Sequence, residues 1–138
     1  IPLSELKDEA FASGALGQGI GILPTDGKIV APLDGTVTTL FPTLHAIGIT
    51  GDSGVEVLIH VGLDTVQMEG KGFRAHVKQG DHIKKGQLLL EVDLSAIEEA
   101  GYLTQTPIII TNSNDMLDII ATDKKEVKNN EDLITVLF

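Results

Sequence analysis

The chain has 138 residues, a net charge of −10 and no cysteine. A domain of this length can bury a core without disulfides or metals, and the lack of cysteine excludes thiol catalysis and cysteine metal sites. Such an acidic chain does not offer the basic face that nucleic acid or an anionic membrane surface requires, but it suits a partner with a positive patch.

Membrane insertion of the chain itself is not expected. The sequence contains no apolar run of the ~18 residues that a membrane helix needs, and it does not open with a basic and then apolar signal segment. We therefore expect a soluble chain, which is compatible with a piece cut from a larger membrane protein.

Short β-branched runs separated by glycine-containing turns predict an all-β fold, either a sandwich or a barrel. Similar glycine-turn patterns in KIVAPLDGTV and HVKQGDHIKKGQLLLEV favour a barrel-sandwich hybrid. The expected strands are Gly19–Leu23, Lys28–Ala31, Thr36–Phe41, His45–Thr50, Val55–Val61, Gly72–Val77, Leu88–Val92, Ile108–Thr111, Leu117–Ala121 and Leu133–Leu137.

One short helix is predicted near the end of this series of strands. Asp93 can cap Leu94–Ala100, and Gly101 suits the left-handed residue that ends a helix. Acidic residues late in this segment oppose the helix dipole, so we expect only one or two helical turns. The charged segment Thr122–Asp132 is predicted to be a turn region.

Two histidines lie in a predicted antiparallel hairpin, TLHAIGITGDSGVEVLIHVG. With the turn centred on Asp52-Ser53, His45 lies opposite His60. Directly opposed residues have Cβ atoms roughly 4.5–5.5 Å apart, so the two imidazoles would share one small site. A slip of one residue would place them on opposite faces. The residues expected on the core face are Leu44, Ala46, Gly48 and Thr50, opposite Val61, Ile59, Val57 and Val55.

Such a pair of imidazoles suits phosphoryl transfer. A neutral ring nitrogen is available near pH 7 and can attack phosphorus, while the neighbouring ring donates a hydrogen bond to the phosphate oxygens. The pattern alone leaves two alternatives open. The histidines could form an ordinary surface or half-buried pair, or they could bind a metal, although the hairpin lacks the remaining ligands that a metal needs.

Several segments resemble the glucose-type enzyme IIA domain of the bacterial phosphoenolpyruvate-dependent sugar phosphotransferase system. They are FASGALGQGIGILPTDGKIVAPLDGTV, LFPTLHAIGI, GVEVLIHVGLDTVQMEGKGF, HVKQGDHIKKGQLLLEVD and TPIIITNS. The resemblance spans nearly the whole chain and is closer to β-glucoside-type permeases in TTLFPTLHAIGIT and LDTVQMEGKGF. It implies an antiparallel β-sandwich whose histidines lie in a shallow surface depression.

The resemblance also implies roles for individual residues. His60 matches the histidine that is phosphorylated on Nε2, and His45 matches the second histidine, which supports the transfer. Thr43 matches the threonine that hydrogen-bonds His45, and Gly62 lies where the backbone orients the phosphorylated ring. His76 and His82, by contrast, are expected to be surface or turn residues.

The family docks its protein partners on an apolar ring around the site. The matching positions are Phe11, Leu16, Phe41, Leu58 and Val66, each of which could instead be an ordinary core residue. Asp64 matches an acidic position that can meet a basic residue of the phosphocarrier protein HPr, and otherwise it reads as a turn residue.

The resemblance implies that HPr donates the phosphate and that the IIB domain of a sugar permease accepts it. We therefore expect residues 1–138 to be a single IIA domain, cytoplasmic, either free or part of an inner-membrane permease. Because the family has one or two further strands before IPLSEL, we expect the N-terminus to be trimmed. Position 44, usually a residue such as lysine, is Leu44 here.

No cofactor is expected for the relay itself. Regulatory partner proteins are compatible with the resemblance, and one of them could complete a zinc site with His45 and His60. Two other classes share parts of the pattern. A biotinyl or lipoyl carrier needs a lysine in a tight turn where this chain has DLSAIEEAG, and a lysostaphin-like zinc peptidase needs a His-x-His pair that is missing after His82.

Overall fold

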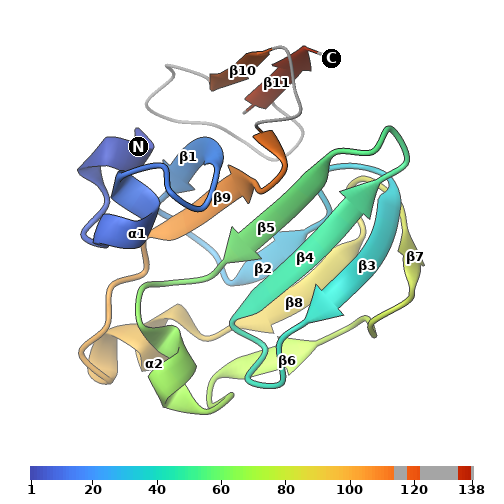
Figure 1. The fold of residues 1–138 in the computed structure, drawn as a ribbon. Coiled ribbons are helices and arrows are strands. Elements are labelled where there is room, and N and C mark those ends of the chain that lie inside the picture. Colours follow the sequence, from blue (N-terminus) through green and yellow to red (C-terminus); the bar gives the residue numbers. More distant parts are fainter. Residues whose placement is uncertain (114–117, 122–133, 138) are drawn as a thin grey trace.

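The computed structural model describes residues 1–113, 118–121 and 134–137. Its regular secondary structure consists mostly of antiparallel strands, together with short helical turns (Figure 1). The strands are β1 Gln18–Ile22, β2 Lys28–Val30, β3 Gly35–Leu40, β4 Ala46–Gly51, β5 Glu56–His60, β6 Phe73–Ala75, β7 His82–Ile83, β8 Leu88–Val92, β9 Thr106–Ile110, β10 Asp118–Ala121 and β11 Ile134–Leu137. The helical turns are η1 Leu3–Glu5, α1 Glu9–Ala12, η2 Thr65–Met68 and α2 Leu94–Glu99.

The predicted all-β class is therefore confirmed, and each predicted strand has an observed counterpart. The bounds differ by a few residues, most clearly for Gly72–Val77, of which only Phe73–Ala75 pairs as a strand. The structure adds the two-residue β7 and the single-turn α1, which are too short to show a periodic pattern. The predicted turn Thr122–Asp132 lies outside the described residues.

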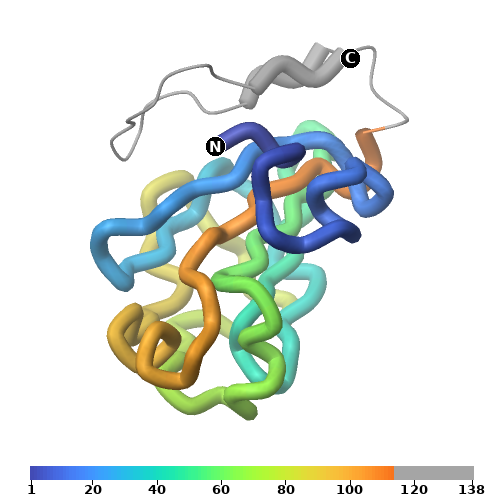
Figure 2. Tube along the Cα trace, turned by 90° about the vertical axis from the view of Figure 1, so that its left-hand side faces the viewer, coloured from blue at the N-terminus to red at the C-terminus, as the bar shows by residue number. Residues whose placement is uncertain are grey.

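The predicted helix is confirmed as α2. The Asp93 side chain accepts a hydrogen bond from the Ala96 amide at 3.2 Å, as a cap does, and Gly101 has a φ of 88°. In the fold α2 lies beside η2, although 25 residues separate them in the sequence (Figure 2).

A six-stranded sheet and a three-stranded sheet enclose the main core. The large sheet has the strand order β1-β9-β5-β4-β3-β7, and the small sheet has the order β2-β8-β6. Side chains from both sheets bury together, and a second, smaller cluster lies where the N-terminal segment meets the large sheet. The main core includes Val37, Ile47, Ile49, Val57, Ile59, Phe73, Leu89, Leu90 and Val92, and the second cluster consists of Leu6, Phe11, Leu63 and Ile109.

The register predicted for the β4–β5 hairpin is wrong by one residue. The structure pairs Ala46 with His60 and Ile47 with Ile59, because the loop has three residues rather than two. The third loop residue, Gly54, has a φ of 97°, a backbone conformation that glycine adopts without strain. On β5 the expected core residues Val57 and Ile59 are confirmed, but on β4 the core face is formed by Ile47 and Ile49 and not by the alternate residues that were expected.

This register makes Ile47 a sharp test of the core. Its side chain is 0% exposed, so Ile47→Ala should lower the free energy of unfolding by about 2–5 kcal/mol through lost burial and the cavity left behind. Leu23→Ala is the control, because Leu23 is 57% exposed and should change stability by no more than about 0.5 kcal/mol. Urea unfolding measures both, and equal losses would contradict the register.

Candidate functional site

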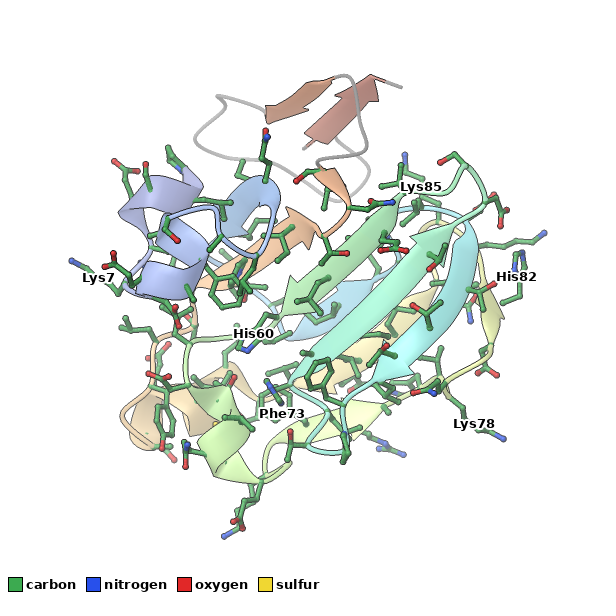
Figure 3. All side chains as sticks on the ribbon, in the orientation of Figure 1. Lys7, His60, Phe73, Lys78, His82 and Lys85 are labelled. Atoms are coloured by element: carbon green, nitrogen blue, oxygen red, sulfur yellow. The ribbon has the colours of Figure 1, made fainter. Side chains whose placement is uncertain are left out.

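His60 ends strand β5 on the face of the large sheet that points away from the main core (Figure 3). Its half-buried ring lies 5.1 Å from the Phe11 ring, measured between centroids. The ring atom Nδ1 is 2.7 Å from the carbonyl oxygen of Gly62. A carbonyl only accepts hydrogen bonds, so Nδ1 carries the proton and Nε2 keeps a free lone pair. That lone pair is a nucleophile.

The carbonyl of Gly62 reaches the ring because the chain turns sharply after β5. Gly62 has a φ of 77°, and a Cβ at this position would lie 2.5 Å from Cγ2 of Thr65 and 3.0 Å from the carbonyl oxygen of Leu103. Only glycine fits both the backbone conformation and the space. The turn is tied down by two hydrogen bonds, from the Thr65 hydroxyl to the Val61 carbonyl at 2.5 Å and from the Leu63 amide to the Leu103 carbonyl at 3.0 Å.

His45 lies one residue before β4 and faces His60. The two ring centroids are 4.9 Å apart with an interplanar angle of 80°, which confirms that the imidazoles share one site. The expectation that a one-residue slip would separate them is wrong, since His45 is not within the regular strand. It follows Leu44, whose φ of 61° redirects the chain before strand alternation begins.

Besides His60, the surroundings of His45 include an aromatic ring and one hydroxyl. The side chain is 3% exposed, and its ring lies edge-on to that of Phe41, with the centroids 5.4 Å apart. The Thr43 hydroxyl lies 2.6 Å from Nδ1 of His45. When this hydroxyl donates, Nδ1 is the acceptor, and the ring proton is on Nε2, from which it can be donated to a ligand.

Both rings are neutral near pH 7. Burial, and secondarily the charge of a protonated His60, lower the pKa of His45 to about 4. Burial also lowers the pKa of His60, while the Gly62 carbonyl and the charges of Asp8 and Asp64 oppose that shift. The neutral rings leave the Nε2 lone pair of His60 available for attack.

Two carboxylates flank His60 closely enough to act on its charge, and only one of them was predicted. Asp64 is exposed and has a left-handed φ of 61° at the start of η2. Asp8 was missed; its side chain caps α1 by accepting from the Ala10 amide at 2.9 Å. An aspartate directly before Glu-Ala-Phe-Ala is a helix-start signal that could have located it.

The residues predicted to form the docking ring differ in exposure. Leu16 and Val66 are each 45% exposed, so they offer apolar surface. Phe41 and Leu58 are half-buried, and Phe11 is buried in the second cluster, where it packs beside the His60 ring. Phe11 therefore supports the site more than it offers surface, and the docking role of the ring stays a prediction.

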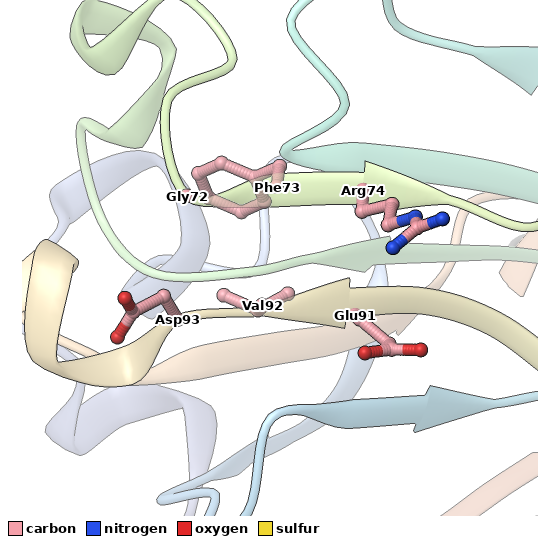
Figure 4. Close-up of a pocket in the computed structure, with 6 residues that line it drawn as sticks. All are labelled: Gly72, Phe73, Arg74, Glu91, Val92 and Asp93. Carbon is pink, nitrogen blue, oxygen red and sulfur yellow. The ribbon is translucent and has the colours of Figure 1, made fainter.

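The other two histidines lie away from the pair, as expected. His82 is exposed at the far edge of the large sheet (Figure 3), and Nε2 of His76 is 2.8 Å from Glu91. A shallow hollow on the small sheet contains neither His45 nor His60 (Figure 4); it is lined by Gly72, Phe73, Arg74, Glu91, Val92 and Asp93. Within residues 1–113 and the two short described strands, no three metal-binding side chains cluster and no helix is long and apolar enough to span a membrane.

Comparison with known proteins adds to this geometry. Residues 1–116 match the family model described as "phosphoenolpyruvate-dependent sugar phosphotransferase system, EIIA 1". A β-glucoside-specific EIIBCA component from Halalkalibacterium halodurans is 53% identical over 134 residues, which are 97% of this chain and 21% of that protein. A glucose-specific EIICBA component from Staphylococcus saprophyticus is 48% identical over 137 residues, 99% of this chain and 20% of that protein.

A solved structure is similar over almost the whole chain. Glucose permease IIA from Mycoplasma capricolum superposes with a TM-score of 0.88 at 38% sequence identity, covering 97% of this chain and 86% of that one. The chain thus spans about a fifth of the length of the two curated relatives and most of the length of the solved one.

The buried His45 should make the folded protein sensitive to acid. Its pKa is about 4 in the fold and about 6.5 in an unfolded chain, so the unfolded state binds more protons between these values. The free energy of unfolding should be fully retained above about pH 6.5 and fall by at most about 3 kcal/mol towards the folded-state pKa. Urea unfolding at several pH values measures this slope.

In this experiment His45→Gln should show a smaller change of the free energy of unfolding with pH than the wild type, because glutamine does not titrate. His82→Gln, at an exposed histidine away from the site, should keep the wild-type slope. An unchanged slope in His45→Gln would show that His45 is not held neutral in the fold.

Proposed function

Since the chain belongs to the EIIA 1 family of the phosphoenolpyruvate-dependent sugar phosphotransferase system, we propose that His60 accepts a phosphoryl group from HPr and passes it to a IIB domain. Membership in the family makes the chain a phosphotransferase component that works through a phosphohistidine. The observation that supports His60 as this histidine is its Nδ1–H held by Gly62 at 2.7 Å, which leaves Nε2 free beside His45.

The transfer is a simple displacement at phosphorus. The Nε2 lone pair of His60 forms the new N–P bond, and the bond between phosphorus and the donor breaks with its electron pair going to the donor. The proton on Nδ1 stays where it is, and the ring becomes positively charged as the bond forms. The Gly62 carbonyl, already 2.7 Å from Nδ1, stabilises that charge without reorganising.

His45 is the residue best placed to stabilise the transferred group. With Thr43 donating to its Nδ1 at 2.6 Å, the Nε2–H of His45 is free to donate to a phosphoryl oxygen. Its low pKa keeps it a neutral donor, so it binds the oxygens without holding the group as a cation would.

The charge around His60 argues for a transient phosphoryl group. Asp8 and Asp64 both act on the ring, and a phosphoryl group carries almost two negative charges near pH 7. These carboxylates repel it, so the compensating cations have to come from the partner. A donor or acceptor with a basic patch would bring them to this surface, with Asp64 as one contact.

The apolar surface proposed for such partners is the predicted docking ring. Leu16 and Val66 are exposed, Leu58 and Phe41 are partly buried, and the Phe41 ring lies 5.4 Å from that of His45 between centroids. Burying exposed apolar side chains on docking excludes water from the reacting atoms. We assign docking of both HPr and the IIB domain to this ring.

Components named EIIBCA and EIICBA among the relatives support a IIB acceptor within the same polypeptide or the same permease. In that arrangement the IIA part faces the cytoplasm, where HPr is expected. The relatives act on β-glucosides or glucose by name, and we propose a sugar of one of these classes for this chain.

A regulatory zinc site is a separate proposal. Two imidazoles with centroids 4.9 Å apart supply two ligands, and zinc requires four, at least one of which a partner protein would have to supply. Equilibrium dialysis tests it: zinc should bind only when the partner is present and should be lost in His60→Gln.

His60→Gln should accept no phosphate from phospho-HPr, because glutamine has no nucleophilic ring nitrogen. Labelled phosphate from HPr should appear on wild type in an acid-labile form, as expected of a phosphohistidine. His76→Gln, which removes a surface histidine paired with Glu91, should label like wild type. Wild-type labelling of His60→Gln would contradict the assignment of His60.

His45→Ala should still accept phosphate from HPr but fail to pass it on. HPr can bring its own basic residue to the phosphoryl oxygens, whereas release towards IIB requires His45 to stabilise them. Mixing labelled His45→Ala with a IIB domain measures the second step. Transfer at the wild-type rate would mean that His45 does not take part in it.

A further inference from the structure

We infer that Thr65 is a positioning residue, which holds the turn that keeps the proton of His60 on Nδ1. This inference rests on the proposed phosphoryl transfer and extends it to a residue that does not touch the phosphoryl group. Thr65 begins η2 and is 0% exposed, which is unusual for a hydroxyl side chain unless the hydroxyl is hydrogen-bonded.

The hydroxyl of Thr65 spans the turn that carries the Gly62 carbonyl. It donates to the carbonyl of Val61 at 2.5 Å, so it joins the residue directly before Gly62 to the first residue of η2. Two backbone hydrogen bonds also tie the ends of this turn to other segments, from the Val61 amide to the His45 carbonyl at 2.7 Å and from the Leu63 amide to the Leu103 carbonyl at 3.0 Å.

The methyl group of Thr65 packs against the same turn at Gly62. A Cβ built on Gly62 would lie 2.5 Å from Cγ2 of Thr65, so the methyl occupies the space beneath Gly62. Both branches of the Thr65 side chain therefore hold Gly62, whose carbonyl oxygen binds His60: the hydroxyl acts through the preceding Val61–Gly62 peptide unit, and the methyl packs at the Gly62 Cα. Serine would reproduce one branch and valine the other.

The turn needs this support because its backbone is unfavourable. Gly62 has a φ of 77°, and Asp64, which has a side chain, has a φ of 61°. A non-glycine residue in the left-handed region costs roughly 1–2 kcal/mol, so the turn would relax if its ties were removed. Relaxation moves the Gly62 oxygen away from Nδ1 of His60.

The consequence is a change of tautomer. An unrestrained histidine prefers its proton on Nε2, which would leave the lone pair on Nδ1, facing the turn instead of the partner. The hydrogen bond to Gly62 reverses that preference. Loss of this hydrogen bond should lower the fraction of His60 that has its proton on Nδ1 and its lone pair on Nε2 by about three- to tenfold, the range expected for one neutral hydrogen bond.

The test is a set of variants at one position with a matched control. Thr65→Val keeps the methyl and removes the hydroxyl, and Thr65→Ser keeps the hydroxyl. Thr106→Val is the control, because Thr106 is also a buried threonine whose hydroxyl donates to a backbone carbonyl, that of Thr104 at 2.9 Å. It should lose similar stability without acting on His60.

Long-range ¹H–¹⁵N spectra of His60 report the tautomer, and labelling from phospho-HPr reports the rate. We expect Nδ1–H in wild type, Thr65→Ser and Thr106→Val, and a mixture in Thr65→Val. The maximal labelling rate of Thr65→Val should fall about three- to tenfold, with the HPr concentration for half-saturation unchanged. A wild-type tautomer and rate in Thr65→Val overturn the inference.

Three outcomes decide between the inference and the proposed function. If Thr65→Val does not fold, Thr65→Cys replaces it, because a thiol is a weak donor, and equal tautomers in Thr65→Cys and Thr65→Ser overturn the inference. A wild-type protein that takes no phosphate on His60 overturns the proposed function, and with it the role of Thr65 in the reaction. A phosphorylated wild type with an unaffected Thr65→Val overturns only the role of Thr65.

Discussion

The hydrogen bond from Nδ1 of His60 to the Gly62 carbonyl is the interaction on which the site depends. It makes one nitrogen a donor and leaves the other as a nucleophile, so it determines both where the ring points and which atom reacts. It requires a glycine at position 62 and a buried threonine at position 65, and both belong to the turn after β5. A single short turn therefore carries more of the chemistry than either sheet does.

The sheets contribute rigidity and burial. Ile47, Ile49, Val57 and Ile59 fix β4 and β5 against the small sheet, and the ends of these two strands bring His45 and His60 together. Burial then lowers the pKa of both rings, so the packing that places the histidines also keeps them neutral. Position and protonation state have the same physical cause.

The sequence predicted the fold class and the pair of histidines better than it predicted how the pair is built. Alternation of apolar residues could not reveal that Gly54 makes a three-residue loop, because both registers place apolar residues on a continuous face. The left-handed backbone at Leu44 then brought His45 to His60 despite the slip. Left-handed residues that are not glycine leave no clear mark in a single sequence. Thr65 follows such a residue, Asp64, so its contribution could not be predicted from spacing.

The acidic surroundings of His60 determine how tightly the chain holds a phosphoryl group in the proposed relay. A site with its own fixed cations would bind a phosphoryl group tightly and release it slowly. Asp8 and Asp64 do the opposite, since they act on the ring with negative charge. The phosphorylated state is then most stable in a complex whose partner supplies the cations, and it is least stable alone. The chain gains a group that it holds only loosely, which is the property that a carrier between two proteins requires.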